Sequence, residues 1–262
     1  MDFLGGQRRG AGFVLSSLKF YTMTKSLLGV FLMALLTLSC GVMDKKITGE
    51  GEVTTVTKDL NRAEKIHVAG NFKVILVPGT TASATIKANA NLQPYIVVEE
   101  KGGKLYLREK KGYSLDADPA IEIRVVSPKI IELDVAGIAE VSSEGKLTGS
   151  DKLNINLAGS GKIDLDINTP TLGVNLAGVG NIDLKGETRD AKFSIAGSGD
   201  CHAFGLKSEN AKVSVAGIGN IDLYAEKNLN ISVAGNGKVQ YKGNAVVKQS
   251  IAGIGSVVKI EE

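Results

Sequence analysis

An eleven-residue motif recurs through the chain and constrains its fold more than any other feature. The motif has the form apolar-x-apolar-Ala-Gly-x-Gly-x-apolar-x-apolar. Its copies are INLAGSGKIDL (155–165), VNLAGVGNIDL (174–184), FSIAGSGDCHA (193–203), VSVAGIGNIDL (213–223), ISVAGNGKVQY (231–241) and QSIAGIGSVVK (249–259), preceded by degenerate copies at 66–76 and 133–143. From Ala136 onward, the alanines of successive copies are 18 to 22 residues apart. Such a period, with two short β segments per unit, predicts an all-β fold: a parallel β-helix (β-solenoid) with coils of about 18–22 residues.

The alternation of side chains within each copy predicts which residues face the interior. Successive residues of a strand point to opposite faces, so Ile182 is expected inside and Asn181 outside. Aligned copies predict two inward columns: Val141, Ile163, Ile182, Cys201, Ile221, Val239 and Val257, and Val135, Leu157, Leu176, Ile195, Val215, Val233 and Ile251. Cys201 is therefore expected to be a small buried hydrophobe and not a reactive thiol. The two glycines of each copy are expected at a corner, where no side chain fits and where a positive φ would also favour glycine.

Composition and charge exclude several classes of protein. With only two cysteines and two histidines, the chain has neither a disulfide framework nor a cysteine-based zinc site. Aromatic residues make up 5% and Trp is missing, so the core must consist of Val, Ile, Leu and Ala. Without the first 39 residues the chain has 27 basic and 27 acidic side chains, which argues against a nucleic-acid partner. No cofactor is expected, because the AGxG segments are strand corners with no helix after them to hold a phosphate.

The N-terminal residues have the pattern of an export signal. Residues 26–39 (SLLGVFLMALLTLS) are uncharged and follow Lys25. The run is shorter than the roughly 20 residues that span a bilayer, and it is typical of the apolar core of a secretory signal. The Ser-Cys40-Gly sequence that follows resembles the lipobox of bacterial lipoproteins, in which the cysteine becomes the lipidated N-terminus. An ordinary signal or anchor with an incidental cysteine is the alternative.

These features predict three segments. Residues 1–39 are a signal peptide, for which Met23 is an alternative start, and residues 40–49 are a lipidated cysteine and a tether. Residues 50–262 are the solenoid domain, which is irregular over 50–130 and regular over 131–262. In the irregular half, β segments are expected at 65–77, 84–88, 95–100, 104–109 and 121–126, with a hairpin turn at 101–104. This half is expected to start or cap the solenoid, because an open end exposes unpaired strand edges.

The mature chain resembles the head GIN domain family, which comprises autotransporter-adhesin-like lipoproteins of Bacteroidetes. Gly180-Asn181-Ile182 and Gly219-Asn220-Ile221 match the motif that names the family. The stretch from Gly49 through Phe72-Lys73-Val74 and the sequence Asn91-Leu92-Gln93-Pro94-Tyr95 also resemble it. The resemblance covers about residues 50–260. It implies a β-helical fold, an envelope location and a role in adhesion or surface binding, and it implies no catalytic residues.

One outward column is a candidate metal site. Asp183, His202 and Asp222 are expected on successive coils of one face, about 4.8 Å apart. A cation or glycan site is one interpretation, and a solvated β face is the other. We expect at most a weak cation site, because ligands fixed in parallel do not surround a metal, whereas zinc requires a tetrahedron and calcium six to eight oxygens.

The sequence therefore favours a non-catalytic binding or adhesion module that is exported to the cell envelope. We expect it at the outer membrane, attached through a lipid on Cys40, with a glycan or a surface protein as its ligand. One alternative is a carbohydrate-active enzyme, a polysaccharide lyase or hydrolase, on the same scaffold. Against it, carboxylates of one column point in parallel and do not face each other across a scissile bond. A purely structural envelope protein is the third interpretation. The ligand and the oligomeric state stay open.

Overall fold

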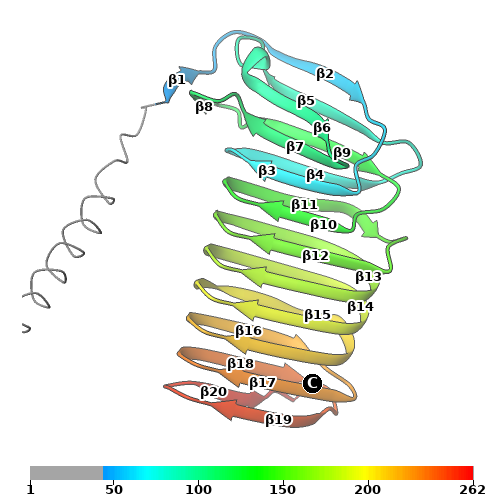
Figure 1. The fold of residues 1–262 in the computed structure, drawn as a ribbon, viewed down its shortest axis with the longest axis vertical. Helices are drawn as coiled ribbons and strands as arrows, with labels where there is room; N and C mark the ends of the chain where they lie inside the picture. Colours follow the sequence, from blue (N-terminus) through cyan, green and yellow to red (C-terminus); the bar gives the residue numbers. More distant parts are fainter. Residues whose placement is uncertain (1–43, 262) are drawn as a thin grey trace, which may run out of the picture. The chain divides into compact units, whose positions relative to one another are not determined.

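The computed structural model describes residues 44–261, and these form an all-β solenoid (Figure 1). The strands of the irregular half are β1 (Lys45–Thr48), β2 (Val53–Asp59), β3 (Lys65–Ala69), β4 (Phe72–Pro78), β5 (Ser83–Asn89), β6 (Ile96–Lys101), β7 (Lys104–Glu109), β8 (Tyr113–Asp116) and β9 (Glu122–Ser127). Those of the repeats are β10 (Glu132–Val135), β11 (Ile138–Leu147), β12 (Lys152–Leu157), β13 (Ser160–Leu176), β14 (Val179–Ile195), β15 (Ser198–Val215), β16 (Ile218–Tyr224), β17 (Asn228–Val233), β18 (Asn236–Lys242), β19 (Val246–Ile251) and β20 (Ser256–Lys259). The one helical segment of the described part is a 3₁₀ turn, η1 (Gln93–Tyr95).

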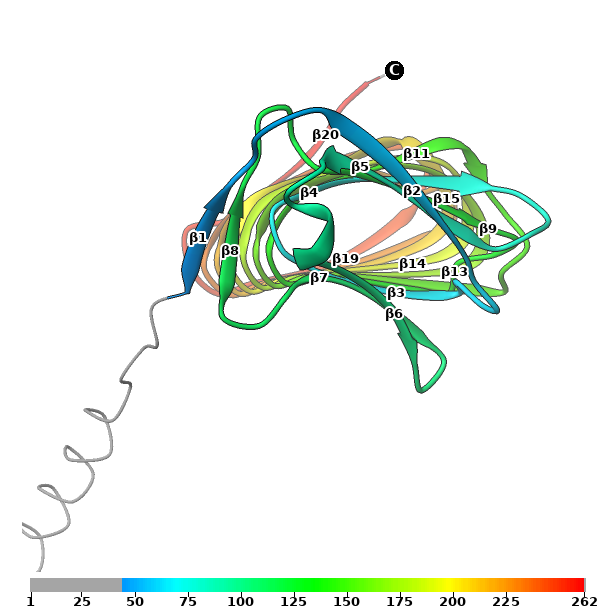
Figure 2. The same ribbon diagram turned by 90° about the horizontal axis from the view of Figure 1, so that it is seen from above.

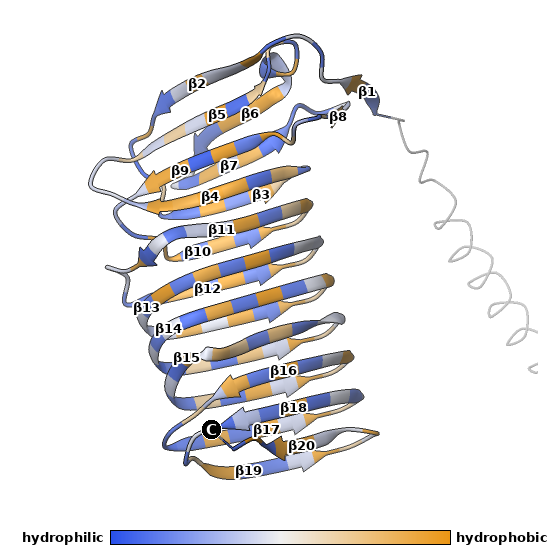
Figure 3. Ribbon diagram, turned by 180° about the vertical axis from the view of Figure 1, so that it is seen from behind, coloured by the Kyte–Doolittle hydropathy of each residue, from blue (hydrophilic) through white to orange (hydrophobic). Residues whose placement is uncertain are grey.

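The repeat coils stack in parallel and in the predicted register. Val141 pairs with Ile163, Ile163 with Ile182 and Ile182 with Cys201, and the column continues through Ile221 and Val239 to Val257. The second column, from Val135 to Ile251, is also continuous. Hydropathy alternates along the strands accordingly, with apolar positions aligned from coil to coil (Figure 3).

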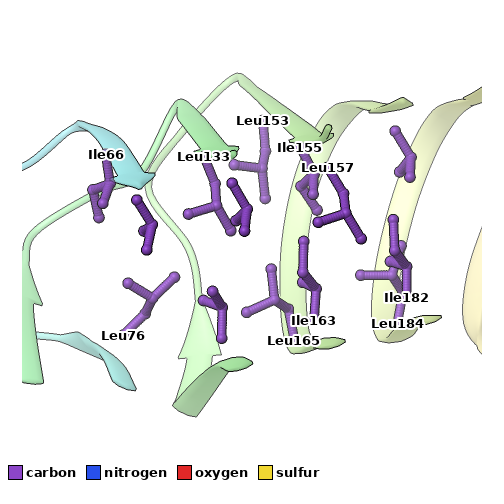
Figure 4. Close-up of a cluster of buried hydrophobic side chains, with 14 of the residues drawn as sticks. Ile66, Leu76, Leu133, Leu153, Ile155, Leu157, Ile163, Leu165, Ile182 and Leu184 are labelled. Atoms are coloured by element: carbon purple, nitrogen blue, oxygen red, sulfur yellow. The ribbon is translucent and has the colours of Figure 1, made fainter. Parts of the chain in front are cut away.

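Aliphatic side chains fill the interior of the stack. Ile155, Ile163 and Ile182 are completely buried, and they meet between the facing strands of each coil (Figure 4). Cys201 is 1% exposed among them, so its burial is as predicted. Each coil adds a flat aliphatic layer, which explains how a chain with so few aromatic residues builds a continuous core.

Only one of the two expected reasons for glycine at the corners holds, the lack of room for a side chain. The chain turns at Ala158-Gly159, whereas the second glycine of that copy, Gly161, already lies in β13. Of the motif glycines, only Gly253 has positive φ in residues 44–261, so the expected left-handed corner is wrong for the other copies. Close packing of coils is the cause: a Cβ on Gly178 would lie 2.0 Å from the carbonyl oxygen of Gly159 on the preceding coil.

Each regular coil has a second bend that the motif did not reveal. It falls inside the long strands β13, β14 and β15, and hydroxyl side chains lie on its inner side. Thr169, Thr188 and Ser208 are adjacent in register and buried. The Thr169 hydroxyl donates to the carbonyl oxygen of Ser150 at 3.0 Å, and that of Ser208 donates to the carbonyl oxygen of Tyr224. Their hydroxyls give buried backbone carbonyls a hydrogen-bond donor.

The irregular half caps one end of the stack, as predicted, but its coils are not stacked in sequence order. The coil formed by β3 and β4 pairs with β10 and β11 on one side and with β7 and β9 on the other. Strand β5 runs antiparallel to both β9 and β2, and these strands cover the end of the stack (Figure 2). Strands β6 and β7 form the expected hairpin, with Gly102 and Gly103 at positive φ.

The opposite end of the stack is open within the described residues. Strands β19 and β20 form the last coil, and Ile251, expected inside, is 40% exposed because no described coil lies beyond it. Gln249 occupies an inward position that is apolar in the earlier copies, next to Ile231 in register. Polar residues at inward positions reduce the apolar area that this end exposes.

Candidate functional site

The three residues of the candidate metal site are neighbours in register, as predicted. Asp183 pairs with His202 and His202 with Asp222. Their side chains do not converge on one point: His202 Nδ1 lies 2.9 Å from Asp222 Oδ2, whereas Asp183 Oδ2 lies 3.7 Å from the ammonium group of Lys162. In residues 44–261, no group of three or more His, Cys, Asp and Glu side chains is arranged to hold a metal ion. His202 therefore contacts Asp222, whereas Asp183 forms a separate ion pair with Lys162.

One atom of this column lacks a partner. Asp222 Oδ1 is buried and accepts no hydrogen bond from the described residues, although the other oxygen of the same carboxylate contacts His202. A buried carboxylate oxygen normally has a donor. A weak cation site on this face thus stays a prediction.

A groove of about 690 Å³ lies on another part of the surface, beside the second bend of the coils. Its size is that of a small-molecule or oligosaccharide site. Five successive coils contribute its walls, which contain one aromatic ring, four carboxylates and two ammonium groups. The lining residues are Glu187, Thr188, Lys207, Ser208, Glu209, Tyr224, Glu226, Gly243, Asn244, Lys259, Ile260 and Glu261.

Tyr224 is at the centre of the interactions in the groove. Its hydroxyl donates a hydrogen bond of 2.6 Å to Glu226 Oε2, and the ammonium group of Lys207 lies 3.7 Å from the centre of its ring. Glu226 Oε1 also accepts from the side-chain amide of Asn244 at 3.4 Å. These contacts position the exposed carboxylate of Glu226 beside Tyr224 and Asn244.

The hydrogen bonds lower the pKa of Glu226. The main cause is the bond from the Tyr224 hydroxyl, followed by that from Asn244. Nearby, Glu209 forms an ion pair of 2.7 Å with Lys227. The lowered pKa favours the ionised carboxylate of Glu226, which accepts hydrogen bonds and attracts cations.

The sequence analysis did not identify this groove. One feature of the sequence could have indicated the groove. Tyr224 is one of only two tyrosines after residue 113, and it directly follows the last apolar residue of its motif copy. The other walls come from the second bend, which the motif does not contain.

The remaining titratable residues singled out from the sequence have structural roles. Burial strongly raises the pKa of the Cys201 thiol, with a further contribution from Asp183, so this thiol is protonated and unreactive at neutral pH. His67 is half-buried and makes an edge-to-face contact with Tyr106, with 5.5 Å between the ring centres. Neither group lines the groove.

Comparison with known proteins identifies the family. The sequence matches the family described as "Putative auto-transporter adhesin, head GIN domain" over residues 63–245. The chain belongs to the head GIN domain family. The resemblance noted from the GIN motifs is therefore confirmed, and so is the solenoid that it implies.

Solved structures of similar proteins support this assignment. A "putative adhesin" from Bacteroides fragilis has 25% identity and a TM-score of 0.78, covering 82% of this chain and 100% of the other. A "putative adhesin" from Parabacteroides distasonis has 25% identity and a TM-score of 0.61 with the same coverage. A "putative lipid binding protein" from Parabacteroides distasonis shares the fold at 24% identity and a TM-score of 0.67, again with this coverage. A search of curated proteins finds no match to this chain.

The predicted anchor is not among the residues that the structure describes. Cys40 and the expected signal peptide (1–39) lie outside residues 44–261. Within that range, no helix has the length and apolar character needed to cross a membrane.

Proposed function

We propose that this head GIN domain protein is an exported lipoprotein of the outer membrane and acts as a non-catalytic binding or adhesion module. The observation that carries the proposal is the groove around Tyr224, which has the volume of a ligand site and a polar, preorganised lining. The family and two of the structural relatives described above are named as putative adhesins, which agrees with a surface role. The ligand that fits the groove best is a glycan.

The chemistry of the lining supports a hydroxyl-rich ligand. Carboxylates accept hydrogen bonds from hydroxyl and amino groups, and Glu187, Glu209, Glu226 and Glu261 supply them from four coils. Asn244 adds an amide that both donates and accepts. The carboxylates outnumber the two lysines of the groove, so a neutral or amino sugar is favoured over an acidic one.

The hydrogen bonds of Glu226 make it unsuitable as the general acid of a glycosidase. A glycosidase requires one carboxylic acid with a raised pKa, so that it can protonate the leaving group. The Tyr224 hydrogen bond acts in the opposite direction and lowers the pKa of Glu226. We therefore place the carbohydrate-active enzyme second to the binding module.

Binding of immobilised glycans by purified residues 41–262 tests this proposal. Glu226→Gln and Asn244→Ala are expected to weaken binding about tenfold each, because each removes one polar contact in the groove. Asn181→Ala, on the outward face away from the groove, is the matched control and should bind as the unmodified domain does. Equal binding by all four proteins would show that the groove is not the site, and release of sugar from the bound glycan would favour the enzyme.

The anchor is tested separately in cells. Cys40→Ser is expected to move the protein from the membrane fraction to the soluble fraction, because the lipid on this cysteine is the proposed attachment. Labelling with a radioactive fatty acid checks the modification directly. An unlabelled wild-type protein would disprove lipidation without affecting the glycan test.

A further inference from the structure

The corners of the solenoid form an exposed stripe on which apolar and polar residues alternate from coil to coil. The residue that follows the first motif glycine is exposed at every corner. These corners lie along the edge of the stack where β3, β12 and β17 turn into the next strand (Figure 1). We call this stripe the corner ridge. Its members, in stacking order, are Asn71, Ile138, Ser160, Val179, Ser198, Ile218, Asn236 and Ile254.

The apolar members of the corner ridge are unusually exposed. Ile138 is 64% exposed, Val179 60%, Ile218 63% and Ile254 82%. From Ala136 onward the alanine at each corner is exposed as well, and no charged residue occurs among the four positions of the AGxG corners from Ala158 onward. An uncharged, partly apolar stripe along the whole stack is typical of an interaction surface.

The geometry points to a second copy of this chain as the occupant: we propose that two solenoids associate ridge to ridge in antiparallel orientation. Coils are about 4.8 Å apart, so the large aliphatic side chains are about 9.6 Å apart, with a small polar residue between them. One aliphatic side chain of a partner fits each gap. A hollow of about 390 Å³ lies beside the ridge at Asn71, Ile138 and Ser160, and Glu140 also lines it.

The alternation selects the orientation of the pair. In a parallel two-fold pair each residue meets its own counterpart, so Ile218 meets Ile218 and the serines meet across an empty gap. In an antiparallel pair, the two ridges can be aligned so that every aliphatic residue lies opposite a polar residue of the partner. Over the full length of the ridge, Ile138 then lies opposite Asn236, Val179 opposite Ser198, Ile218 opposite Ser160 and Ile254 opposite Asn71. An isologous pair of this kind is closed and stops at two copies.

The charges beside the ridge match the same register. The next outward column contains Glu140, Lys162, Asn181, Asp200, Asn220 and Lys238. The two-fold axis brings this column against itself, with Glu140 opposite Lys238 and Asn181 opposite Asp200. A shift by two coils in one direction would instead place Glu140 opposite Asp200, which is repulsive, and a shift by two coils in the other direction would leave Glu140 without an opposite residue. Within residues 44–261, neither Glu140 nor Lys238 has an ion-pair partner in its own chain.

The expected association is weak. A ridge one residue wide buries less than the roughly 800 Å² per partner of a standard interface. We therefore expect a dissociation constant between about 10 μM and 1 mM. Sedimentation equilibrium of purified residues 41–262 over this range measures it.

A charge-reversal series tests the register as well as the surface. Glu140→Lys and Lys238→Glu should each weaken the dimer at least about fivefold, because each places like charges opposite one another. The double variant Glu140→Lys/Lys238→Glu restores opposite charges and should recover most of the affinity. Lys212→Glu, on another face, is the matched control and should leave the dissociation constant unchanged.

Removal of the apolar contacts gives a second readout. Ile218→Ser makes three successive corners polar and should weaken the dimer about tenfold, with the melting temperature of the monomer unchanged because the side chain is exposed. A monomer at 1 mM would overturn the proposal. So would a dimer that the ridge variant does not weaken, or a double charge variant that is no tighter than the single ones.

Discussion

His202 Nδ1 lies 2.9 Å from Asp222 Oδ2, on the next coil of the stack. The pair is close because parallel coils place aligned residues about 4.8 Å apart, which is within reach of two outward side chains. Asp183, on the other side of His202, faces Lys162 instead. The pairing leaves no position at which three of these ligands meet.

We predict that this column binds no metal tightly. Calorimetric titration of residues 41–262 with zinc and calcium should give at most millimolar affinity, and the melting temperature should not depend on either ion. His202→Ala is the matched variant. Micromolar binding that is lost in this variant would make the column a metal site.

Opposite faces of one strand should respond very differently to substitution. Ile182→Asp places a charge in a fully buried aliphatic column and is expected to cost more than about 4 kcal/mol, enough to unfold the solenoid. Asn181→Ala, one residue earlier and exposed, should change stability by no more than about 0.5 kcal/mol. Thermal unfolding followed by circular dichroism compares the two, and similar melting temperatures would contradict the observed inward and outward alternation.

A corner glycine should tolerate alanine less well than a glycine of the flat face. In Gly178→Ala the new methyl group would lie 2.0 Å from the carbonyl oxygen of Gly159, so the coils must separate, at a cost of about 1–3 kcal/mol or more. In Gly173→Ala the nearest atom is Oδ1 of Asn154 at 2.8 Å, and this side chain can rotate away. Chemical denaturation should show a loss within about 1 kcal/mol for Gly173→Ala, and an equal loss in both variants would rule out the steric explanation.

The ion cluster around Lys104 should make stability depend on acid pH. Lys104 Nζ lies 2.6 Å from both Glu132 Oε1 and Asp134 Oδ2. Burial raises the pKa of Asp134, but hydrogen bonds from Lys104 and Asn156 outweigh this effect, and the net pKa is lowered. A lowered pKa in the folded state means that the stabilisation is fully present above the unfolded value of about 3.9 and disappears as the pH falls through the folded value.

Asp134→Asn is the variant that isolates this contribution. At pH 7 it should be less stable than the unmodified domain by about 1–2 kcal/mol, because Lys104 loses a charged partner. Below the unfolded value of about 3.9 the difference should shrink, since the carboxylate of the unmodified protein becomes protonated as the pH falls through its lowered folded pKa. Urea denaturation between pH 2 and pH 7 measures it, and a difference that does not vary with pH would assign the effect to packing.

The repeat determined most of the fold. Alignment of the motif copies predicted the inward columns, including the neighbours of Cys201. It also predicted the order Asp183, His202, Asp222, because adjacent parallel coils pair residue with residue. The hairpin at Gly102-Gly103 followed in the same way, since local turn chemistry specifies it. These features depend only on which residues are neighbours, and a repeated sequence shows this directly.

Tertiary structure decided what the repeat does not encode. Strands β3 and β4 are inserted between the β7–β9 coil and the β10–β11 coil, an order that depends on long-range packing and not on sequence proximity. The groove at Tyr224 forms because the second bends of several coils come together there, each built from residues outside the motif. Which partner each carboxylate contacts likewise depends on side-chain rotamers, so Asp183 turns to Lys162 while Asp222 turns to His202. A sequence period specifies which residues are adjacent, and only the packed structure specifies in which direction their side chains point.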